Sequence, residues 1–191
     1  MATFSLADFF AGLASVTATA ELDSDTSADE TGGGVLNRAS YGTRLWGGTV
    51  TIAPSYHADA DAIAAKIQYL QEADVTFRVS PAWKMQAPVS TGAVSGISIS
   101  DRRDVALGTA RLTDGAIFGI VAANGMRSMH RVATRSGPTH YVIPALPFAM
   151  APNDIVTYGQ PEIDAYLVSA SLPTYRAVIA DGVSFQWRQT Y

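Results

Sequence analysis

Hydrophobic and polar residues alternate along most of the chain, which is the spacing of β-strands that bury one face. The last strand is the clearest case, because Val183, Phe185 and Trp187 are separated by polar residues. Similar patterns predict strands over 16–22, 47–54, 75–79, 97–99, 105–107, 117–123, 126–133, 140–143, 163–168 and 175–179. We expect about eight to ten short strands from these segments.

Two segments have helical spacing instead. In the longer one, apolar residues recur every three or four positions, and Asp59 and Asp61 stand at the start, where the helix dipole favours carboxylates. The shorter one begins with the capping-box-like sequence Ser5–Asp8. The apolar positions are Ala60, Ile63, Ala64, Ile67 and Leu70 in the longer segment, and Leu6, Phe9, Phe10 and Leu13 in the shorter. We expect the stripe of the longer helix to pack against the strands and not to form an interface.

Polar and glycine-containing segments separate the predicted strands. Asn124-Gly125 and Asp181-Gly182 favour tight two-residue hairpin turns in which both positions have positive φ. The sequence Asp101–Asp104 predicts a charged turn between two strands. Residues 23–34 are polar and acidic and contain three consecutive glycines, so we expect a mobile loop or the tip of a hairpin there.

These elements predict a mainly β protein, a closed or split antiparallel β-barrel with one flanking helix, formed by residues 1–191 as a single domain. A chain of 191 residues with 48% hydrophobic and 16% charged residues is typical of a packed globular protein. The chain has no cysteine, so its stability does not depend on disulfides. No apolar run approaches the ~20 residues of a membrane span, and we expect no membrane insertion.

The charges are unevenly distributed. Residues 1–36 contain six acidic residues and no lysine or arginine, and the remainder contains 13 basic and 11 acidic residues. Eleven of the basic residues are arginine, which is common at protein interfaces because its guanidinium group binds carboxylates through two bonds. The net charge of −4 argues against nucleic-acid binding as the main activity.

Few residues suggest catalysis, and we expect neither an enzyme nor a metal or other cofactor. His57 lies in His57-Ala-Asp59-Ala-Asp61, but the two aspartates are better explained as helix N-terminal residues. His130 and His140 lie on predicted strands and are expected in a core or an interface. The chain has no Gly-x-Ser-x-Gly motif, and no Gly-Lys-Ser/Thr follows the glycines of 32–34.

The order of the elements and a few motifs over residues 40–191 form a pattern. The motifs are Ser40-Tyr-Gly-Thr-Arg-Leu-Trp-Gly-Gly-Thr-Val-Thr-Ile-Ala-Pro54, the alanine-rich helix, the strand over 75–79, the proline-containing loop after it, the stretch 115–132, and the final strand with Phe185 and Trp187. In this pattern residues 40–191 resemble the distal tail proteins of long-tailed bacteriophages, which are related to tail-tube subunits.

The resemblance implies a β-barrel "belt" domain that assembles into a homo-hexameric ring in the virion after synthesis in the host cytoplasm. In that family the ring joins the tail tube to the tail-tip hub or baseplate, and DNA passes through its channel without specific binding. Many members also carry a galectin-like carbohydrate-binding domain, for which this chain has no room. The family has no catalytic residues to transfer.

A ring subunit needs two different surfaces that meet in a closing contact, and opposite charges would fix its register. We therefore expect residues 1–36, with the loop 23–34, to contribute to assembly by contacting arginines of a neighbouring subunit or ring. The candidate residues are Glu21, Asp23, Asp25, Asp29 and Glu30 on one side, and Arg102, Arg103, Arg127, Arg131 and Arg135 on the other.

Two alternatives remain open. The chain has features of a tail-tube or tail-terminator subunit as well, and copy number in a particle would separate these roles. A carbohydrate-binding β-sandwich module would need exposed aromatic side chains. Trp46 and Trp187 are expected in the core, which leaves Trp83 in the loop 81–88 as the plausible exposed one.

Overall fold

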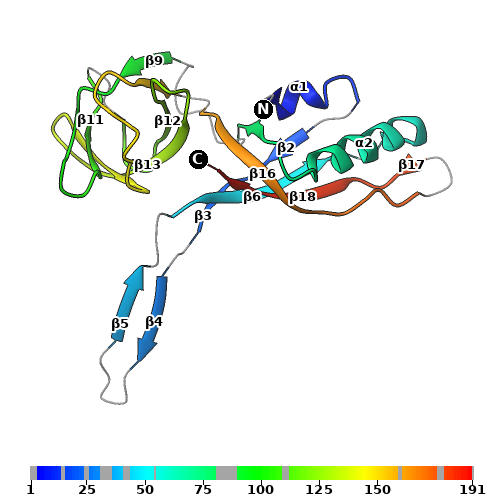
Figure 1. The fold of residues 1–191 in the computed structure, drawn as a ribbon, viewed down its shortest axis with the longest axis horizontal. Helices are drawn as coiled ribbons and strands as arrows, with labels where there is room; N and C mark the ends of the chain where they lie inside the picture. The colour runs from blue at the N-terminus through cyan, green and yellow to red at the C-terminus, as the bar shows by residue number, and fades with distance from the viewer. Residues whose placement is uncertain are drawn as a thin grey trace.

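The protein is mainly β and forms two curled antiparallel sheets, with a two-stranded hairpin projecting from them (Figure 1). The computed structural model describes residues 4–13, 16–23, 26–30, 36–40, 44–53, 55–80, 90–108, 112–158, 161–175 and 179–190. For residues 7, 26–30, 36–40 and 90 only the backbone is described.

The first sheet combines the two ends of the chain. Its strand order is β1-β8-β16-β18-β6-β2, and the short β3 also pairs with β6. All its pairs are antiparallel except β1 with β8. The strands are β1 (Phe4–Ser5), β2 (Val16–Ala18), β3 (Glu21–Leu22), β6 (Trp46–Ile52), β8 (Phe77–Val79), β16 (Ile163–Ala170) and β18 (Val183–Gln189).

One face of the first sheet is covered by helices. The buried side chains of α2 (His57–Leu70) are Ala60, Ile63, Ile67 and Leu70, which are the predicted stripe apart from the half-buried Ala64. Ile63, Ile67 and Leu70 share a core with Phe77, Phe185 and Trp187, so the expected packing of this helix is confirmed. The short α1 (Leu6–Phe9) adds Leu6, and Phe10 follows it into the same core.

The second sheet curls around a core of its own. Its order is β10-β11-β14-β13-β12-β15-β9. The two outer strands of this sheet, β9 and β10, are separated in the sequence only by Val94 and Ser95. The Val94 side chain is fully buried. The strands are β9 (Ser90–Ala93), β10 (Gly96–Ile97), β11 (Asp104–Ala106), β12 (Ile117–Val121), β13 (Arg127–Ser136), β14 (Thr139–Ile143) and β15 (Ile155–Tyr158).

The two sheets touch where β13 of the second meets the first sheet. Met129 of β13 is fully buried in the core of the first sheet. The indole nitrogen of Trp46, at the start of β6, donates a hydrogen bond to the backbone oxygen of Met129. The backbone nitrogen of Trp46 in turn donates to the side-chain oxygen of Gln189 at the end of β18.

A hairpin formed by β4 (Thr26–Glu30) and β5 (Leu36–Ser40) projects from the edge of the first sheet, and we call it the arm (Figure 1). Among the described strands, β4 and β5 pair only with each other. At the base of the arm, the nitrogen of Asp23 donates to the oxygen of Leu45, and Arg44 Nε donates to the oxygen of Asp23 over 2.7 Å. A mobile loop or hairpin tip was expected over 23–34, but residues 26–30 form a paired strand of the hairpin instead. Residues 24–25 and 31–35 lie outside the described part.

The turn at Asn124-Gly125 joins adjacent strands, as predicted, but its geometry differs. Gly125 has a φ of +85°, whereas the φ of Asn124 is not positive. Gly125 N donates to Ala122 O, and Ala122 N donates to Met126 O, so three residues form the connection. This is the pattern of a turn followed by a left-handed glycine, which also suits the strand twist.

The predicted hairpin at Asp181-Gly182 is wrong. Strand β18 pairs with β16 and β6, whereas β17 (Ile179–Ala180) pairs with β7 (Ser55–Tyr56). The nitrogen of Asp181 donates to the oxygen of Thr174. The chain between β16 and β18 therefore turns aside to form a separate two-stranded sheet, because the long sheet leaves no neighbouring position for β17.

Three other expectations were also inaccurate. Ile99 was expected in a strand, but β10 ends at Ile97 and the Ile99 side chain is 96% exposed. The first helix ends at Phe9 and does not reach Leu13. The count of eight to ten strands was too low, mainly because the described residues contain strands that were not predicted, such as β1, β4, β5, β9 and β15. The mainly β class is confirmed, and a single closed or split barrel remains a prediction.

Candidate assembly surfaces

The predicted acidic interface residues are divided between the base of the arm and the arm itself. Glu21 of β3 is exposed, and Asp23 lies at the base. Asp29 and Glu30 belong to β4, of which only the backbone is described, and Asp25 lies outside the described residues. The structure thus places an acidic strand on an element that contacts little of its own chain.

Asp23 has a partner that the sequence did not suggest. Its carboxylate accepts a 2.8 Å hydrogen bond from the guanidinium of Arg188, the last arginine of the chain. The two side chains are 56% and 46% exposed, so the pair contributes little to stability. Only the register of β3, β6 and β18 in the sheet brings these residues together.

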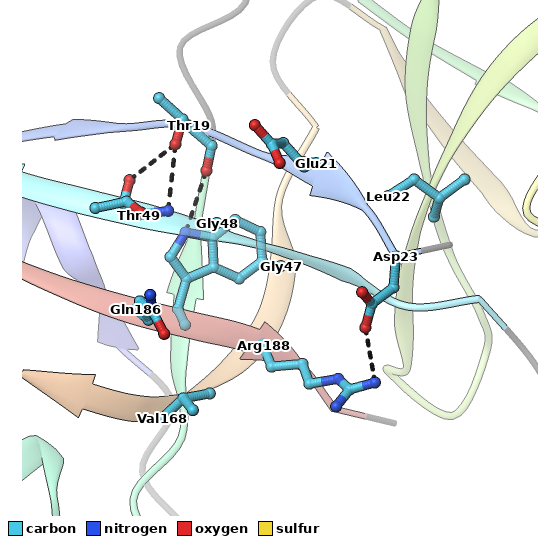
Figure 2. A pocket seen from close by; sticks show the side chains of 11 residues that line it. Thr19, Glu21, Leu22, Asp23, Gly47, Gly48, Thr49, Val168, Gln186 and Arg188 are labelled. Atoms are coloured by element: carbon cyan, nitrogen blue, oxygen red, sulfur yellow. Dashed lines mark hydrogen bonds and ion pairs between the residues drawn. The ribbon is translucent and has the colours of Figure 1, made fainter. Parts of the chain in front are cut away.

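An open groove of about 450 Å³ lies beside this pair, over β6 and β18 (Figure 2). Gly47 and Gly48 form part of it, and the chain between β2 and β3 passes close over Gly48. A Cβ atom on Gly48 would lie 2.1 Å from the oxygen of Thr19. The Thr19 hydroxyl donates to the oxygen of Thr49 and accepts from its nitrogen, both over 3.2 Å, as Figure 2 shows.

The lining of this groove does not favour covalent catalysis. Its hydroxyl groups belong to Thr19 and Thr49, and no histidine lines it. A hydroxyl nucleophile needs an adjacent base within hydrogen-bonding distance, and Thr19 bonds to backbone instead. The groove is a rigid feature of the sheet surface with one ion pair at its end.

Among the predicted arginines, Arg102 serves its own chain. It adopts a φ of +56° in the turn between β10 and β11, where the charged turn was predicted. Its guanidinium group donates to the backbone oxygens of Leu146, Pro147 and Met150. These bonds fix the segment that follows β14, so the Arg102 side chain has an internal structural role.

The other predicted arginines are spread over the second sheet. Arg103 donates to the hydroxyl of Tyr141 over 3.1 Å, and Arg127 lies 3.6 Å from the Glu162 carboxylate. Arg131 stacks over the Trp46 ring at 5.7 Å, and Arg135 is exposed near the end of β13. Thus Arg102 and Arg103 lie together, whereas Arg127, Arg131 and Arg135 follow a separate strand.

A second pocket, of about 220 Å³, lies next to Arg103, and two nearby apolar side chains are nearly fully exposed. Phe148 lines it and is 90% exposed, with the Arg102 guanidinium 5.1 Å from its ring centre. Ile99 adjoins the lining residue Ser100 and is 96% exposed. Arg44, from the base of the arm, completes the wall. We call Arg44, Ile99, Arg103 and Phe148 the Phe148 surface.

The histidines show no metal site. In the described part of the chain, no three histidine or acidic side chains are grouped to hold a metal. The His57 ring lies edge-on to Tyr175, whose hydroxyl donates to Asp61. Burial lowers the pKa of His140, and its Nε2 accepts a hydrogen bond from the nitrogen of Leu112 over 3.1 Å.

His130 and Ser128 lie 2.6 Å apart, a distance that a nucleophile and its base would also have. Both side chains are fully buried, and burial lowers the pKa of His130 to about 4. A group of such low pKa is a weak base near neutral pH, and no substrate reaches it. The pair is a buried structural contact, in agreement with the core position expected for this histidine.

No family model matches this chain, and no curated protein has a similar sequence. Among the described helices, none is long and apolar enough to cross a membrane. The role of these surfaces is therefore inferred from the charge, exposure and contacts of their residues.

The Phe148 surface was missed at the level of sequence. Ile99 fits the alternating pattern of a strand, and Phe148 follows a proline without any repeating pattern. Arg44 was part of the motif used for the family resemblance, but it was not among the predicted interface residues. Proximity of Arg44 to Asp101–Arg103 depends on the packing of the two sheets, which no local pattern encodes.

Proposed function

We propose that this protein is a structural subunit of a bacteriophage tail, the distal ring that connects the tail tube to the tail-tip hub or baseplate. In this proposal six copies surround the DNA channel, and the two curled sheets correspond to a belt domain of the split-barrel type. The protein acts by assembly and has no catalytic role, metal or other cofactor.

The arm is the observation that carries this proposal. Within the described part of the chain, the two strands of the arm pair only with each other. Such a hairpin gains little stability from its own subunit, because an isolated two-stranded hairpin is marginal in water. Such an element is expected to gain its contacts in an assembly. At its base the nitrogen of Asp23 is bonded to the oxygen of Leu45, and its two strands extend away from the sheets (Figure 1).

The exposed face of the first sheet supports a role next to DNA. The solvent-facing positions of β2, β6 and β18 include Thr17, Thr51, Ser184 and Gln186, which are uncharged. Arg188 on this face is paired with Asp23, and Arg78 lies 3.9 Å from the Asp164 carboxylate. A wall whose arginines are balanced by carboxylates would bind phosphates weakly, as passage of DNA through a channel requires.

The tail-tube and tail-terminator roles use the same kind of subunit and remain alternatives. The carbohydrate-binding alternative loses two of its three candidate residues, because Trp46 and Trp187 are 1% and 2% exposed. Trp83, the third, lies outside the described residues. A sugar-binding site normally presents its aromatic rings at the surface.

The decisive experiment is to locate and count the protein in purified phage particles. Quantitative mass spectrometry should give about six copies, and immunogold labelling should mark the junction between tube and tip. Many stacked copies would identify a tube protein, and label at the head-proximal end would identify a terminator. Absence of the chain from particles would exclude all three roles.

A further inference from the structure

The Phe148 surface has the composition of an interface centre. Ile99 and Phe148 are the two most exposed large hydrophobic side chains among the described residues, at 96% and 90%. Phe148 lines one hollow of about 220 Å³ together with Arg44 and Arg103, and Ile99 precedes the lining residue Ser100 in the sequence. Aromatic and arginine side chains around a pocket are the groups that contribute most to protein–protein binding.

The charge of this surface indicates an acidic occupant. Among the residues that the structure describes, Arg44, Arg102 and Arg103 line the pocket with a single carboxylate, that of Asp101. Asp101 is engaged locally, since its oxygen accepts a hydrogen bond from the nitrogen of Arg103. The most acidic part of the sequence is residues 1–36, with six carboxylates and no basic residue.

The arm cannot bring its own acidic residues to this pocket. Arg44 lies at the base of the arm, and the arm extends away from both sheets (Figure 1). Asp29 and Glu30 of β4 are six and seven residues beyond Asp23, which corresponds to about 20 Å of extended chain. Asp29 and Glu30 therefore lie on a strand that leads away from the arginines of the same copy (Figure 1).

We propose that the arm of one copy docks on the Phe148 surface of the next copy. This inference rests on the proposed ring assembly and names the contact that builds it. The β4 strand, with Asp29 and Glu30, lies against Arg44 and Arg103, and Ile99 and Phe148 pack on the arm. Because the two surfaces differ, each copy both gives an arm and receives one, which is the heterologous contact that a closed ring requires.

Two separate variants test this pairing. In the first, residues 24–43 are replaced by Gly-Gly, a change the fold should accept because the nitrogen of Asp23 and the oxygen of Leu45 already close the base. In the second, Ile99 and Phe148 are both changed to serine. Both are almost fully exposed, so this change should leave the thermal unfolding temperature of the subunit unaltered. Ile155→Ser, 54% exposed on β15, is the matched control.

Analytical ultracentrifugation of each protein, and of a 1:1 mixture of the two variants, gives the result. The parent and Ile155→Ser should form the ring. Each variant alone should remain monomeric, with association weakened by about tenfold or more, as expected for loss of a central contact. The mixture should form a dimer and nothing larger, because it contains one intact arm and one intact Phe148 surface.

Other results would overturn the inference in distinguishable ways. If either variant formed the ring as readily as the parent, the docking contact would be wrong while the ring itself remained. If both variants were monomeric and their mixture formed no dimer, the arm and the Phe148 surface would not be partners. A parent that stayed monomeric at every concentration would contradict the proposed ring function as well as the docking contact.

Discussion

The indole Nε1 of Trp46 donates a 2.6 Å hydrogen bond to the backbone oxygen of Met129, and this bond connects the two sheets. The two residues are 83 positions apart in the sequence, and both are buried. Arg131 covers the ring of Trp46, and Gln189 accepts the Trp46 backbone N–H. Trp46 therefore joins β6, β13 and the end of β18 at one point.

Replacing Trp46 by phenylalanine should weaken this junction. The substitution removes the donor and leaves the buried Met129 oxygen without it, which costs about 1–3 kcal/mol of the free energy of unfolding. Trp187→Phe is the matched control, because its indole donates a longer bond of 3.2 Å to Thr19 at a partly buried site. Urea unfolding should show the larger loss for Trp46→Phe. Equal losses for both variants would indicate that the bond to Met129 contributes no more than the longer bond from Trp187 to Thr19.

Alternation of apolar residues revealed much of the fold because it reports burial, and burial is a local property of a strand in a sheet. In β18, Val183, Phe185 and Trp187 are buried and the residues between them are exposed, as predicted. Pairing partners are not local. Asp181-Gly182 has the composition of a hairpin turn, yet the neighbours of β18 are β16 and β6, so a turn-forming sequence did not imply adjacent strands.

The candidate surfaces were less predictable, because the sequence reveals charge but not the partner of a charge. Arg102 was selected as an interface residue, and its guanidinium group instead holds three backbone oxygens of the segment 146–150. Asp23 was selected as well, and its partner within the chain is Arg188. Ile99 looked like an inward-facing strand residue because the sequence did not show that β10 stops at Ile97.

Gly48 should be required for the crossing of the β2–β3 connection over β6. A Cβ atom there would lie 2.1 Å from the Thr19 oxygen and 2.8 Å from its carbon, both backbone atoms that cannot rotate away. We expect Gly48→Ala to lower the melting temperature by several degrees. Gly96→Ala is the control, since its Cβ would meet the Ala106 side chain at an ordinary 3.7 Å. Similar melting temperatures for the two variants would show that the connection moves freely.

The apolar stripe of α2 should stabilise the subunit itself. Ile67 is fully buried in the core of the first sheet. Ile67→Ala should cost about 2–5 kcal/mol of the free energy of unfolding, and Ile67→Asp should abolish soluble expression. Gln68→Ala, at an exposed neighbouring position, should change little. A soluble, folded Ile67→Asp protein that failed only to assemble would reassign α2 to a contact surface.

His130 should make the stability of the subunit depend on pH in a defined direction. Its Nδ1 lies 2.9 Å from the oxygen of Pro144, which can only accept, so Nδ1 carries the proton and Nε2 accepts from Ser128. Burial lowers the pKa of this histidine to about 4 from an ordinary value of 6.5. Between these two values the unfolded chain takes up a proton that the folded chain does not bind. Folding is therefore disfavoured as the pH falls through this range.

The contribution of His130 amounts to about 2 kcal/mol lost between about pH 7 and pH 4.5. Other groups titrate in the same range, so the test compares the parent with His130→Gln, which cannot bind the proton. Urea unfolding should show a steeper fall in the free energy of unfolding for the parent, by about that amount. Parallel curves for the parent and His130→Gln would mean that the folded protein protonates His130 as readily as the unfolded chain does.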